Sequence, residues 1–311
     1  MDNKSVKMAL GCDSPVFKKG EDVAYLMDAM LQEGANIFDS ARLYGKSEEV
    51  IGKYINDHQN RKDCFIITKG CHPMPFNRLN VKALRRDLEQ SLRTLNIGYI
   101  DLYLLHRDHH NANLKEILDV LNKYKAKGKI LHYGLSNWSL DRIKEFNTLA
   151  EASGYEKAYA ISNNFTLIPW EKDPWGGGDG CVSFSNDKEA YEYLKETQTP
   201  LLSYSPLARG FLSGRVKSDD PSSFDILDRS AKRAYCSKRN IEKLKELEEI
   251  AKELGLTIPE LTLAYLANTE INVYPIIGTT SAERLKKNIE SLSIKLSKDI
   301  MERLKSIAFL D

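Results

Sequence analysis

Four polar side chains between residues 39 and 106 have the types needed to deliver a proton to a carbonyl oxygen. Asp39 and Tyr44 lie five residues apart in FDSARLYG, Lys69 ends the run FIITK, and His106 ends the run DLYLLH. A carbonyl that accepts hydride develops negative charge on its oxygen, so its reduction needs a positioned proton donor. The pKa of a tyrosine is ordinarily about 10, and a neighbouring ammonium that stabilises the phenolate lowers it. We therefore expect Lys69 to lower the pKa of Tyr44, Asp39 to hold Lys69, and His106 to orient the substrate through an imidazole N–H.

Each of these residues also has a structural explanation when it is considered alone. Asp39 could cap a helix, Tyr44 could pack in a loop, Lys69 could be exposed, and His106 could be a hydrogen-bonded histidine of the core. Asp39, Lys69 and His106 nevertheless lie at the ends of three successive predicted strands, and Tyr44 lies in the loop after the first of these. This shared placement favours one common site.

The segments around these residues alternate between short apolar runs and amphipathic helices. Predicted helices cover residues 19–33, 80–95, 113–127, 139–151, 187–197 and 238–254, and a last helix follows 278. Predicted strands cover 8–12, 36–38, 64–69, 99–106, 130–136, 158–162, 201–205 and 273–278. Eight strands with interleaved helices predict a (β/α)8 TIM barrel, which we expect to be a single domain over residues 1–311.

A doubly wound open sheet shares this alternation of strands and helices. Two features favour the barrel: polar residues recur at the carboxyl ends of the predicted strands, and no GxGxxG fingerprint follows any strand. The most irregular segments are 169–185, with Trp170, Trp175 and three glycines at 176–178, and 215–237. We expect both to be loops over the C-terminal face of the barrel.

The balance of charged residues argues against nucleic acid or an anionic membrane as the partner of this protein. The 45 Lys and Arg residues balance 44 Asp and Glu residues for a formal charge of +1, without a basic block suited to nucleic acid or an anionic membrane. A small-molecule substrate is expected, and the absence of a long apolar run predicts a cytoplasmic protein that does not enter a membrane. The five cysteines are scattered, so we interpret them as reduced structural thiols. His109 and His110, next to Asp108, suggest a metal only weakly because no further ligand is suitably spaced, and no metal is expected.

Six segments resemble the ordered motifs of the aldo-keto reductase family. They extend from about residue 34 to 288 and read GANIFDSARLYGKSEEVIG, FIITKG, YIDLYLLHRD, YGLSNWS, YSPLARGFLSG and PIIGTTSAERLKKN. The resemblance implies a (β/α)8 barrel that binds NADPH without a Rossmann motif and reduces an aldehyde or ketone to the alcohol. It also implies a catalytic tetrad of Asp39, Tyr44, Lys69 and His106, with Tyr44 as general acid in reduction and general base in oxidation.

A second line of argument concerns the phosphate groups of a cofactor. Gly278, Thr279 and Thr280 lie after the last predicted strand and just before a helix, where backbone N–H groups and hydroxyls suit a phosphate. Arg284 offers a guanidinium for a 2′-phosphate or for stacking on adenine, and Asn288 lies one helical turn later on the same face. An ordinary capped helix would explain the same residues. The family resemblance favours the cofactor site and, through Arg284, NADPH over NADH.

The resemblance assigns the remaining cofactor contacts. Ser136 and Asn137 would hold the nicotinamide carboxamide, and Tyr204 would stack on its ring. Ser162 lies where many members carry glutamine, and Gly278 lies where some carry lysine, so a cationic contact to the 2′-phosphate depends mainly on Arg284. The other contacts implied are Gly11, Asp39, Ser205, Pro206, Leu207, Ala208, Gly210 and Leu212.

The sequence does not specify the carbonyl substrate or the oligomeric state. Tyr44, His106 and Trp138 are predicted to line the substrate site, although Trp138 could instead pack against a helix. An alternative function is an NADPH-binding sensor or regulatory protein with slow or vestigial turnover. Another is a phosphosugar isomerase or aldolase on the same barrel, which would share the phosphate site but would not bind NADPH.

Overall fold

The computed structural model of the chain describes residues 6–73, 78–175 and 180–309. Its strands follow each other around a closed barrel in sequence order, with helices between them, which confirms the predicted (β/α)8 fold. The strands are β1 (Ala9–Gly11), β2 (Ile37–Asp39), β3 (Phe65–Gly70), β4 (Ile100–Leu105), β5 (Ile130–Ser136), β6 (Ile161–Ser162), β7 (Leu201–Tyr204) and β8 (Val273–Ile277).

The chain divides into two compact units, which we describe separately. The first lies within Met1–Ser162 and Ile276–Lys286, and the second lies within Asn163–Pro275 and Lys287–Asp311. A single domain over residues 1–311 therefore stays a prediction. The glycines at 176–178, which belong to a predicted loop, lie outside the described residues.

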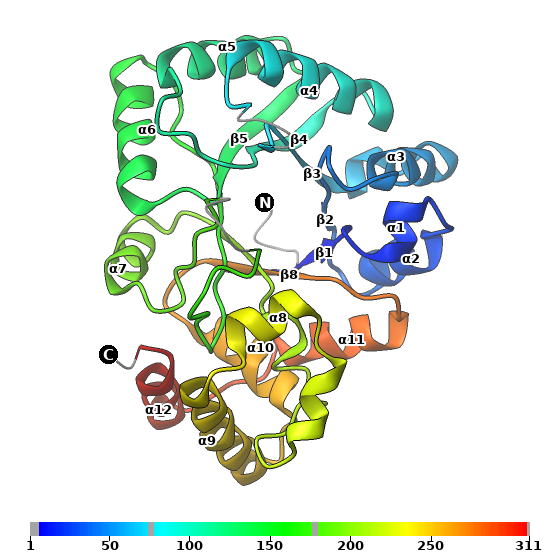
Figure 1. Cartoon of the computed structure of the whole chain (residues 1–311). Coiled ribbons are helices and arrows are strands. Elements are labelled where there is room, and N and C mark those ends of the chain that lie inside the picture. The colour runs from blue at the N-terminus through cyan, green and yellow to red at the C-terminus, as the bar shows by residue number, and fades with distance from the viewer. Residues whose placement is uncertain (1–5, 74–77, 176–179, 310–311) are drawn as a thin grey trace. The chain divides into compact units, whose positions relative to one another are not determined.

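In the first unit, helices lie on the outer side of parallel strands (Figure 1). Every residue of β4 is buried, as expected for a parallel strand that is covered on both faces. The helix α4 buries Leu84 and Leu88 on one side and is capped at Asn80, whose side chain accepts a hydrogen bond from Ala83 N. The helices are α1 (Pro15–Lys19), α2 (Ala24–Gln32), α3 (Ser47–His58), α4 (Val81–Leu95), α5 (Leu114–Ala126) and α6 (Leu140–Ala152), with a 3-10 turn at η1 (Arg61–Asp63).

The register of the first unit brings its strand ends to one edge of the sheet. Gly11 pairs with Asp39, and Asp39 pairs with Ile67, two residues before Lys69. The hydrogen bond from His106 N to Gly70 O (2.9 Å) extends the ladder past the end of β4. Ser136 pairs with Ser162 on the next two strands. The residues that follow these strands consequently share the C-terminal edge.

The second unit holds β7 and most of the later helices. Asn164, just after β6, forms a parallel bridge to Tyr204 at the end of β7. The helix α10 begins with a capping box in which Thr257 and Glu260 satisfy each other's backbone N–H groups. The helices are α7 (Lys188–Thr197), α8 (Arg229–Tyr235), α9 (Lys238–Leu254), α10 (Ile258–Asn268) and α12 (Lys298–Ala308), with 3-10 turns at η2 (Ala208–Gly210) and η3 (Pro221–Ile226). The helix α11 (Ala282–Ser291) begins in the first unit and ends in the second.

Several predicted elements differ from the structure. The helix predicted at 19–33 corresponds to the shorter α2, and the unpredicted α1 precedes it and ends at Gly20, which adopts a left-handed φ of 78°. The last predicted helix is two helices, α11 and α12, and the predicted elements omit α3 and α10. The segment 215–237 is not an open loop, since it contains η3 and α8.

Candidate active site

Three of the four predicted acid-site residues are buried at the C-terminal edge of adjacent strands. Asp39 is the last residue of β2, Lys69 lies near the end of β3, and His106 follows β4 directly. They are 3 %, 3 % and 6 % exposed, respectively. Charged side chains at this depth need partners, since an unpaired buried charge is strongly destabilising. The arrangement is therefore a defined site and not a set of surface residues.

The Lys69 ammonium lies at the centre of this site. Its Nζ donates hydrogen bonds to Asp39 Oδ2 at 2.6 Å and to Ser40 O at 3.0 Å. The same nitrogen is 5.0 Å from the centroid of the Tyr44 ring. One cation thus contacts both the carboxylate that holds it and the phenol that it can influence.

Two tight turns fix the backbone on both sides of Tyr44. Tyr44 N donates to Ala41 O at 2.9 Å, and Ser47 N donates to Tyr44 O at 3.0 Å. Gly45 has a φ of 57°, and a Cβ there would lie 2.6 Å from Lys18 O. Only glycine fits this close approach in a left-handed conformation. The Tyr44 side chain, which is partly buried, is thereby held at the edge of the site.

His106 lies beside Tyr44 in the same site. The two ring centroids are 6.0 Å apart in an edge-on arrangement, and the His72 ring lies 4.8 Å from His106 on another side. Burial lowers the pKa of His106 well below its usual range, and the positive charges of Lys69 and Arg107 lower it further. His106 is therefore a neutral imidazole at neutral pH, with one N–H to donate.

The predicted direction of the Tyr44 pKa shift is wrong. Burial raises the pKa of Tyr44 to about 12, and the opposing effect of the Lys69 ammonium is smaller. Lys69 acts in the predicted sense, but desolvation of the phenolate outweighs it. Tyr44 therefore keeps its proton at neutral pH, which is the state that a proton donor requires.

Lys69 keeps its positive charge in the buried pair with Asp39. Burial acts to lower the pKa of Lys69, but the nearby Asp39 and Tyr44 outweigh it, so the pKa of Lys69 is raised. Burial also raises the pKa of Asp39, against the effect of Lys69. A lysine with a raised pKa remains an ammonium throughout the physiological range.

The residues predicted to bind a carboxamide lie at the ends of two neighbouring strands: Ser136 ends β5, Asn137 follows it, and Ser162 ends β6. Asn137 has a φ of 60°, and its Nδ2 donates to Ser136 Oγ at 3.0 Å and to His106 O at 3.4 Å. Ser162 is 1 % exposed, and its Oγ has no hydrogen-bond partner within the described residues. A buried hydroxyl without a partner is costly unless a ligand satisfies it. These donors and acceptors fit an amide group such as that of nicotinamide.

The predicted phosphate loop lies at the start of α11. Ser281, which the sequence reasoning did not single out, caps the helix by accepting a hydrogen bond from Arg284 N at 3.2 Å. Thr279 Oγ1 accepts from Ser281 N at 3.1 Å, and the Arg284 side chain is exposed. The signal for the cap was present, since a serine three residues before Arg284 matches the spacing of an N-cap.

Gly278 leaves open space beside this loop, whereas Gly11 is closely packed against Ile276. A Cβ at Gly278 would meet only Gly11 O, at 3.8 Å, and a Cβ at Gly11 would lie 3.1 Å from Ile276 Cγ2. The open side of Gly278 allows a ligand to approach the backbone. The helix start, the exposed guanidinium and this space fit an anionic group.

In the second unit, one loop after β7 contains the predicted pyrophosphate contacts. Left-handed φ values recur along it, at Ser205 (51°), Ala208 (49°) and Gly210 (97°). Thr166 Oγ1 anchors the loop by donating to Pro206 O at 2.6 Å. The N–H groups of Ala208, Gly210 and Leu212 are used within the loop, where they donate to the carbonyl oxygens of Ser205 and Leu207. The other predicted contacts in this unit are Tyr204, Leu207, Leu212 and Asn288.

Tyr204 lies among aromatic residues of the preceding loop. The ring centroids of Trp170 and Trp175 are each 6.4 Å from that of Tyr204. Arg209 lies 5.2 Å over the Trp175 ring and pairs with Asp228 at 2.7 Å. Both tryptophans therefore lie beside Tyr204 in their own unit, and Trp175 keeps 42 % of its surface exposed.

Trp138 packs against a helix, as the alternative interpretation had it. It is fully buried, its ring meets Phe146 of α6 edge-on at 5.8 Å, and Arg142 lies 5.5 Å over it. A ring without exposed surface offers no face to a substrate. We therefore correct the prediction that Trp138 lines the substrate site.

Asp108, His109 and His110 make contacts with each other and with α6. Arg142 holds Asp108 through two hydrogen bonds, at 2.8 and 3.1 Å, and the rings of His109 and His110 pack on each other. Within the described residues no group of histidine, cysteine, aspartate or glutamate side chains is arranged for a metal ion. Among the described residues, the five cysteines form no disulfide bond.

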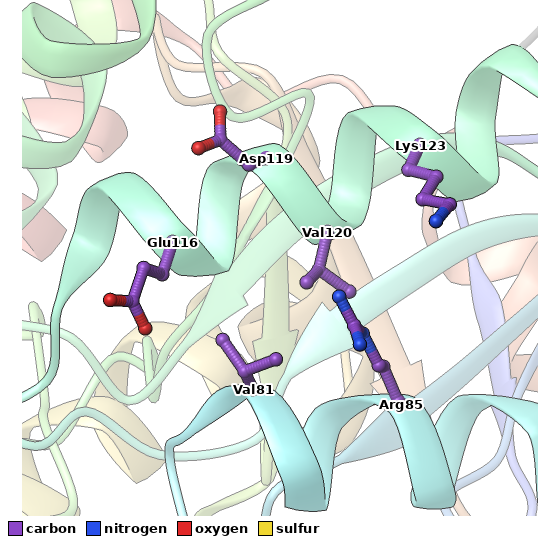
Figure 2. A pocket seen from close by; sticks show the side chains of 6 residues that line it. All are labelled: Val81, Arg85, Glu116, Asp119, Val120 and Lys123. Atoms are coloured by element: carbon purple, nitrogen blue, oxygen red, sulfur yellow. The ribbon is translucent and has the colours of Figure 1, made fainter.

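A surface groove of about 330 Å³ lies between α4 and α5 (Figure 2). It contains none of the predicted site residues, and its charged lining is shared between acidic and basic side chains. The lining residues are Val81, Arg85, Glu116, Asp119, Val120 and Lys123. Among the described helices, none is long and apolar enough to cross a bilayer.

Comparison with known proteins identifies the family. Residues 8–308 match the model of the Aldo/keto reductase family. The chain therefore belongs to the aldo/keto reductase family and is an oxidoreductase of that family. This agrees with the barrel and with the resemblance carried by the sequence motifs.

Individual relatives are distant but cover most of the chain. An aldo-keto reductase from Schizosaccharomyces pombe, yakc, whose name specifies NADP(+), is 29 % identical over 85 % of this chain and 76 % of its own length. A putative aryl-alcohol dehydrogenase of the same organism is 26 % identical over 97 % of this chain and 92 % of its own. The solved structure of the thermostable aldo-keto reductase Tm1743, in complex with the inhibitor epalrestat, superimposes with a TM-score of 0.71 at 25 % identity, covering 97 % of this chain and 94 % of that one.

Proposed function

We propose that this protein is an NADPH-dependent carbonyl reductase in which Tyr44 donates the proton. The observation that carries the proposal is the position of the Lys69 ammonium, 2.6 Å from Asp39 Oδ2 and 5.0 Å from the centroid of the Tyr44 ring. When bound, NADPH supplies the hydride for the carbonyl carbon. All other steps belong to the residues of the chain.

Tyr44 donates its hydroxyl proton to the carbonyl oxygen as negative charge develops there. Lys69 stabilises the phenolate that remains, and Asp39 keeps Lys69 in place. The neutral His106 donates one N–H to the same oxygen and so orients the substrate. In the reverse direction, the Tyr44 phenolate accepts a proton from the alcohol.

The proposed cofactor contacts follow the chemistry of each segment. Ser136, Asn137 and Ser162 would hold the carboxamide, because they place hydroxyl and amide groups in buried surroundings. Tyr204 would stack on the nicotinamide ring, and the loop Ser205–Leu212 would follow the pyrophosphate. Gly278, Thr279, Thr280, Arg284 and Asn288 would bind the adenosine end, with Arg284 at the 2′-phosphate. The name of the yakc relative, which specifies NADP(+), supports the choice of phosphorylated cofactor.

The wider assignment is a cytoplasmic enzyme, folded as one domain, that acts on a small aldehyde or ketone. Fractionation of cells tests the location. A single cooperative unfolding transition, seen alike by calorimetry and by fluorescence, tests the single domain. Two separated transitions would contradict it.

Two assays on the purified protein test the proposed function. A fluorescence titration should show NADPH binding, and absorbance of the reduced nicotinamide should fall when a nitrobenzaldehyde is added. Tight binding with negligible turnover across a panel of carbonyl compounds would instead favour a sensor or regulatory protein. Failure to bind NADPH would favour an isomerase or aldolase on the same barrel.

A further inference from the structure

Glu48 is a buried carboxylate that the proposed chemistry does not use. It lies in the first turn of α3 and is 1 % exposed. Its Oε1 accepts a hydrogen bond from Thr68 Oγ1 at 2.7 Å, and its Oε2 pairs with Arg42 Nη1 at 3.2 Å. Both carboxylate oxygens are thus engaged by side chains from other segments, which is what makes the burial of this charge tolerable.

The two partners of Glu48 adjoin the acid site on different segments. Thr68 immediately precedes Lys69 in β3. Arg42 lies two residues before Tyr44, and its backbone N donates to Lys69 O at 2.9 Å. The carboxylate of Glu48 therefore joins the strand that carries the ammonium to the loop that carries the phenol.

A second contact closes the same loop at its ends. Ser40 Oγ donates to Ser47 Oγ at 2.8 Å, and both serines are fully buried. The loop from Asp39 to Ser47 is consequently held at its two ends by hydroxyls and in its middle by Arg42. The contact through Arg42 and Glu48 adds a side-chain connection to Thr68, beside the backbone hydrogen bonds from Ser40 N to Ile67 O and from Arg42 N to Lys69 O that already join the loop to β3.

We propose that a positioning relay, formed by Arg42, Glu48 and Thr68, holds the Tyr44 side chain at the distance from the Lys69 ammonium that proton transfer requires. The three residues are positioning residues, because they act through Tyr44 and Lys69 and do not touch substrate or cofactor. The relay rests on the proposed role of Tyr44 as general acid. Since a misplacement of about 1 Å at a reacting group costs up to about 100-fold in rate, loss of the relay lowers the rate of the chemical step.

Three variants test the relay, with kcat, KM and the Kd for NADPH measured separately. Glu48→Gln keeps the shape of the side chain but places an amide N–H₂ against Arg42 or Thr68. Arg42→Met removes the cation at a position whose side chain is 27 % exposed and leaves the buried Glu48 carboxylate with Thr68 as its remaining partner, so thermal stability is measured beside the kinetic constants. We expect both to lower kcat by about 10- to 100-fold while KM and the Kd for NADPH stay within about twofold. Arg42→Lys keeps the cation and should recover most of the lost kcat.

Lys53→Met is the matched control. Lys53 is on the same helix as Glu48 and pairs with Asp57 on its exposed face, where ion pairs contribute little. This variant should turn over like the wild type. Tyr44→Phe in the same assay separates the two proposals.

The relay is overturned if Glu48→Gln and Arg42→Met turn over like the wild type while Tyr44→Phe is inactive. It is also overturned if both variants lose NADPH affinity and thermal stability in proportion to kcat, since the contact would then be merely structural. Wild-type turnover by Tyr44→Phe would overturn the proposed function and the relay with it.

Discussion

Removal of the Lys69 ammonium should destabilise the protein as well as inactivate it. Lys69 and Asp39 are each 3 % exposed, and their atoms Nζ and Oδ2 are 2.6 Å apart. In Lys69→Met, Asp39 would remain buried without its counter-ion. Breaking a buried pair in this way costs about 3–5 kcal/mol. We therefore expect the free energy of unfolding at neutral pH to fall by about that amount in urea denaturation.

The double variant Asp39→Asn, Lys69→Met separates the structural effect from the chemical one. It removes both charges, so no unpaired carboxylate remains, and the free energy of unfolding should recover by at least about half of the loss. Turnover should stay as low as in the single variant, because the phenolate of Tyr44 still lacks its cation.

The pH dependence of Lys69→Met gives a further check, with a sign set by burial. Burial raises the pKa of Asp39 in the folded protein, and the variant lacks the lysine that opposes this shift. The folded state then binds a proton at pH values where the unfolded state has released it. Stability is therefore retained at low pH and is lost as the pH rises through the raised pKa. A loss of less than about 1 kcal/mol, or a double variant no more stable than Lys69→Met, would refute the reasoning.

Three further predictions concern separate residues. Arg284→Ala should raise the Kd for NADPH by about tenfold and change the Kd for NADH little, because only NADPH carries the 2′-phosphate. Fluorescence titration measures both constants. Equal effects on the two cofactors would contradict this role of Arg284. His106→Gln should lower kcat without removing a limb of the pH–rate profile between about pH 6 and 8. The reason is that burial and Lys69 keep the pKa of His106 below that range. Disappearance of a limb in that range would show that His106 titrates there. Lys243, on α9, is 2 % exposed, and burial lowers its pKa from 10.5 to about 8. Lys243→Met should therefore stabilise the protein at pH 7 by up to about 3 kcal/mol. This difference shrinks as the pH rises from about 8 to 10.5, because the wild-type protein gains stability over that range. A destabilised variant would show that the ammonium is well solvated.

The order of the strands and the residues at their ends were predictable from local patterns. Runs such as FIITK and LYLLH consist mainly of apolar residues and end in Lys69 or His106, and such a run without polar alternation is typical of a buried parallel strand. Lys69 and His106 were placed by that pattern alone. The parallel register then makes their proximity to Asp39 a consequence of the fold.

Other features depend on contacts between distant segments and have no local signal. The helix α10 buries residues on all sides, so it lacks the one-sided periodicity by which helices are recognised. The hydrogen bond from Thr68 to Glu48 spans 20 residues, and that from Tyr25 Oη to Thr280 O spans 255. The environment of Trp138 depends on Phe146 and Arg142, which reach it only after α6 has packed.

The Tyr44 pKa shows why the identity of a site is easier to predict than its electrostatics. The charge of Lys69 was visible in the sequence, and its effect has the predicted sign. The degree of burial, which determines the larger effect, depends on the three-dimensional packing around the phenol.

The most direct test of the proposed function is a single-turnover measurement with NADPH already bound. Tyr44→Phe keeps the ring and removes the hydroxyl, and Tyr155→Phe makes the same change at a partly exposed tyrosine whose hydroxyl donates to Asp119. We predict that Tyr44→Phe lowers the rate of NADPH oxidation by a carbonyl compound by about 10²- to 10⁴-fold with unchanged NADPH affinity, while Tyr155→Phe reacts like the wild type. Wild-type rates in Tyr44→Phe would contradict the assignment of Tyr44 as the proton donor.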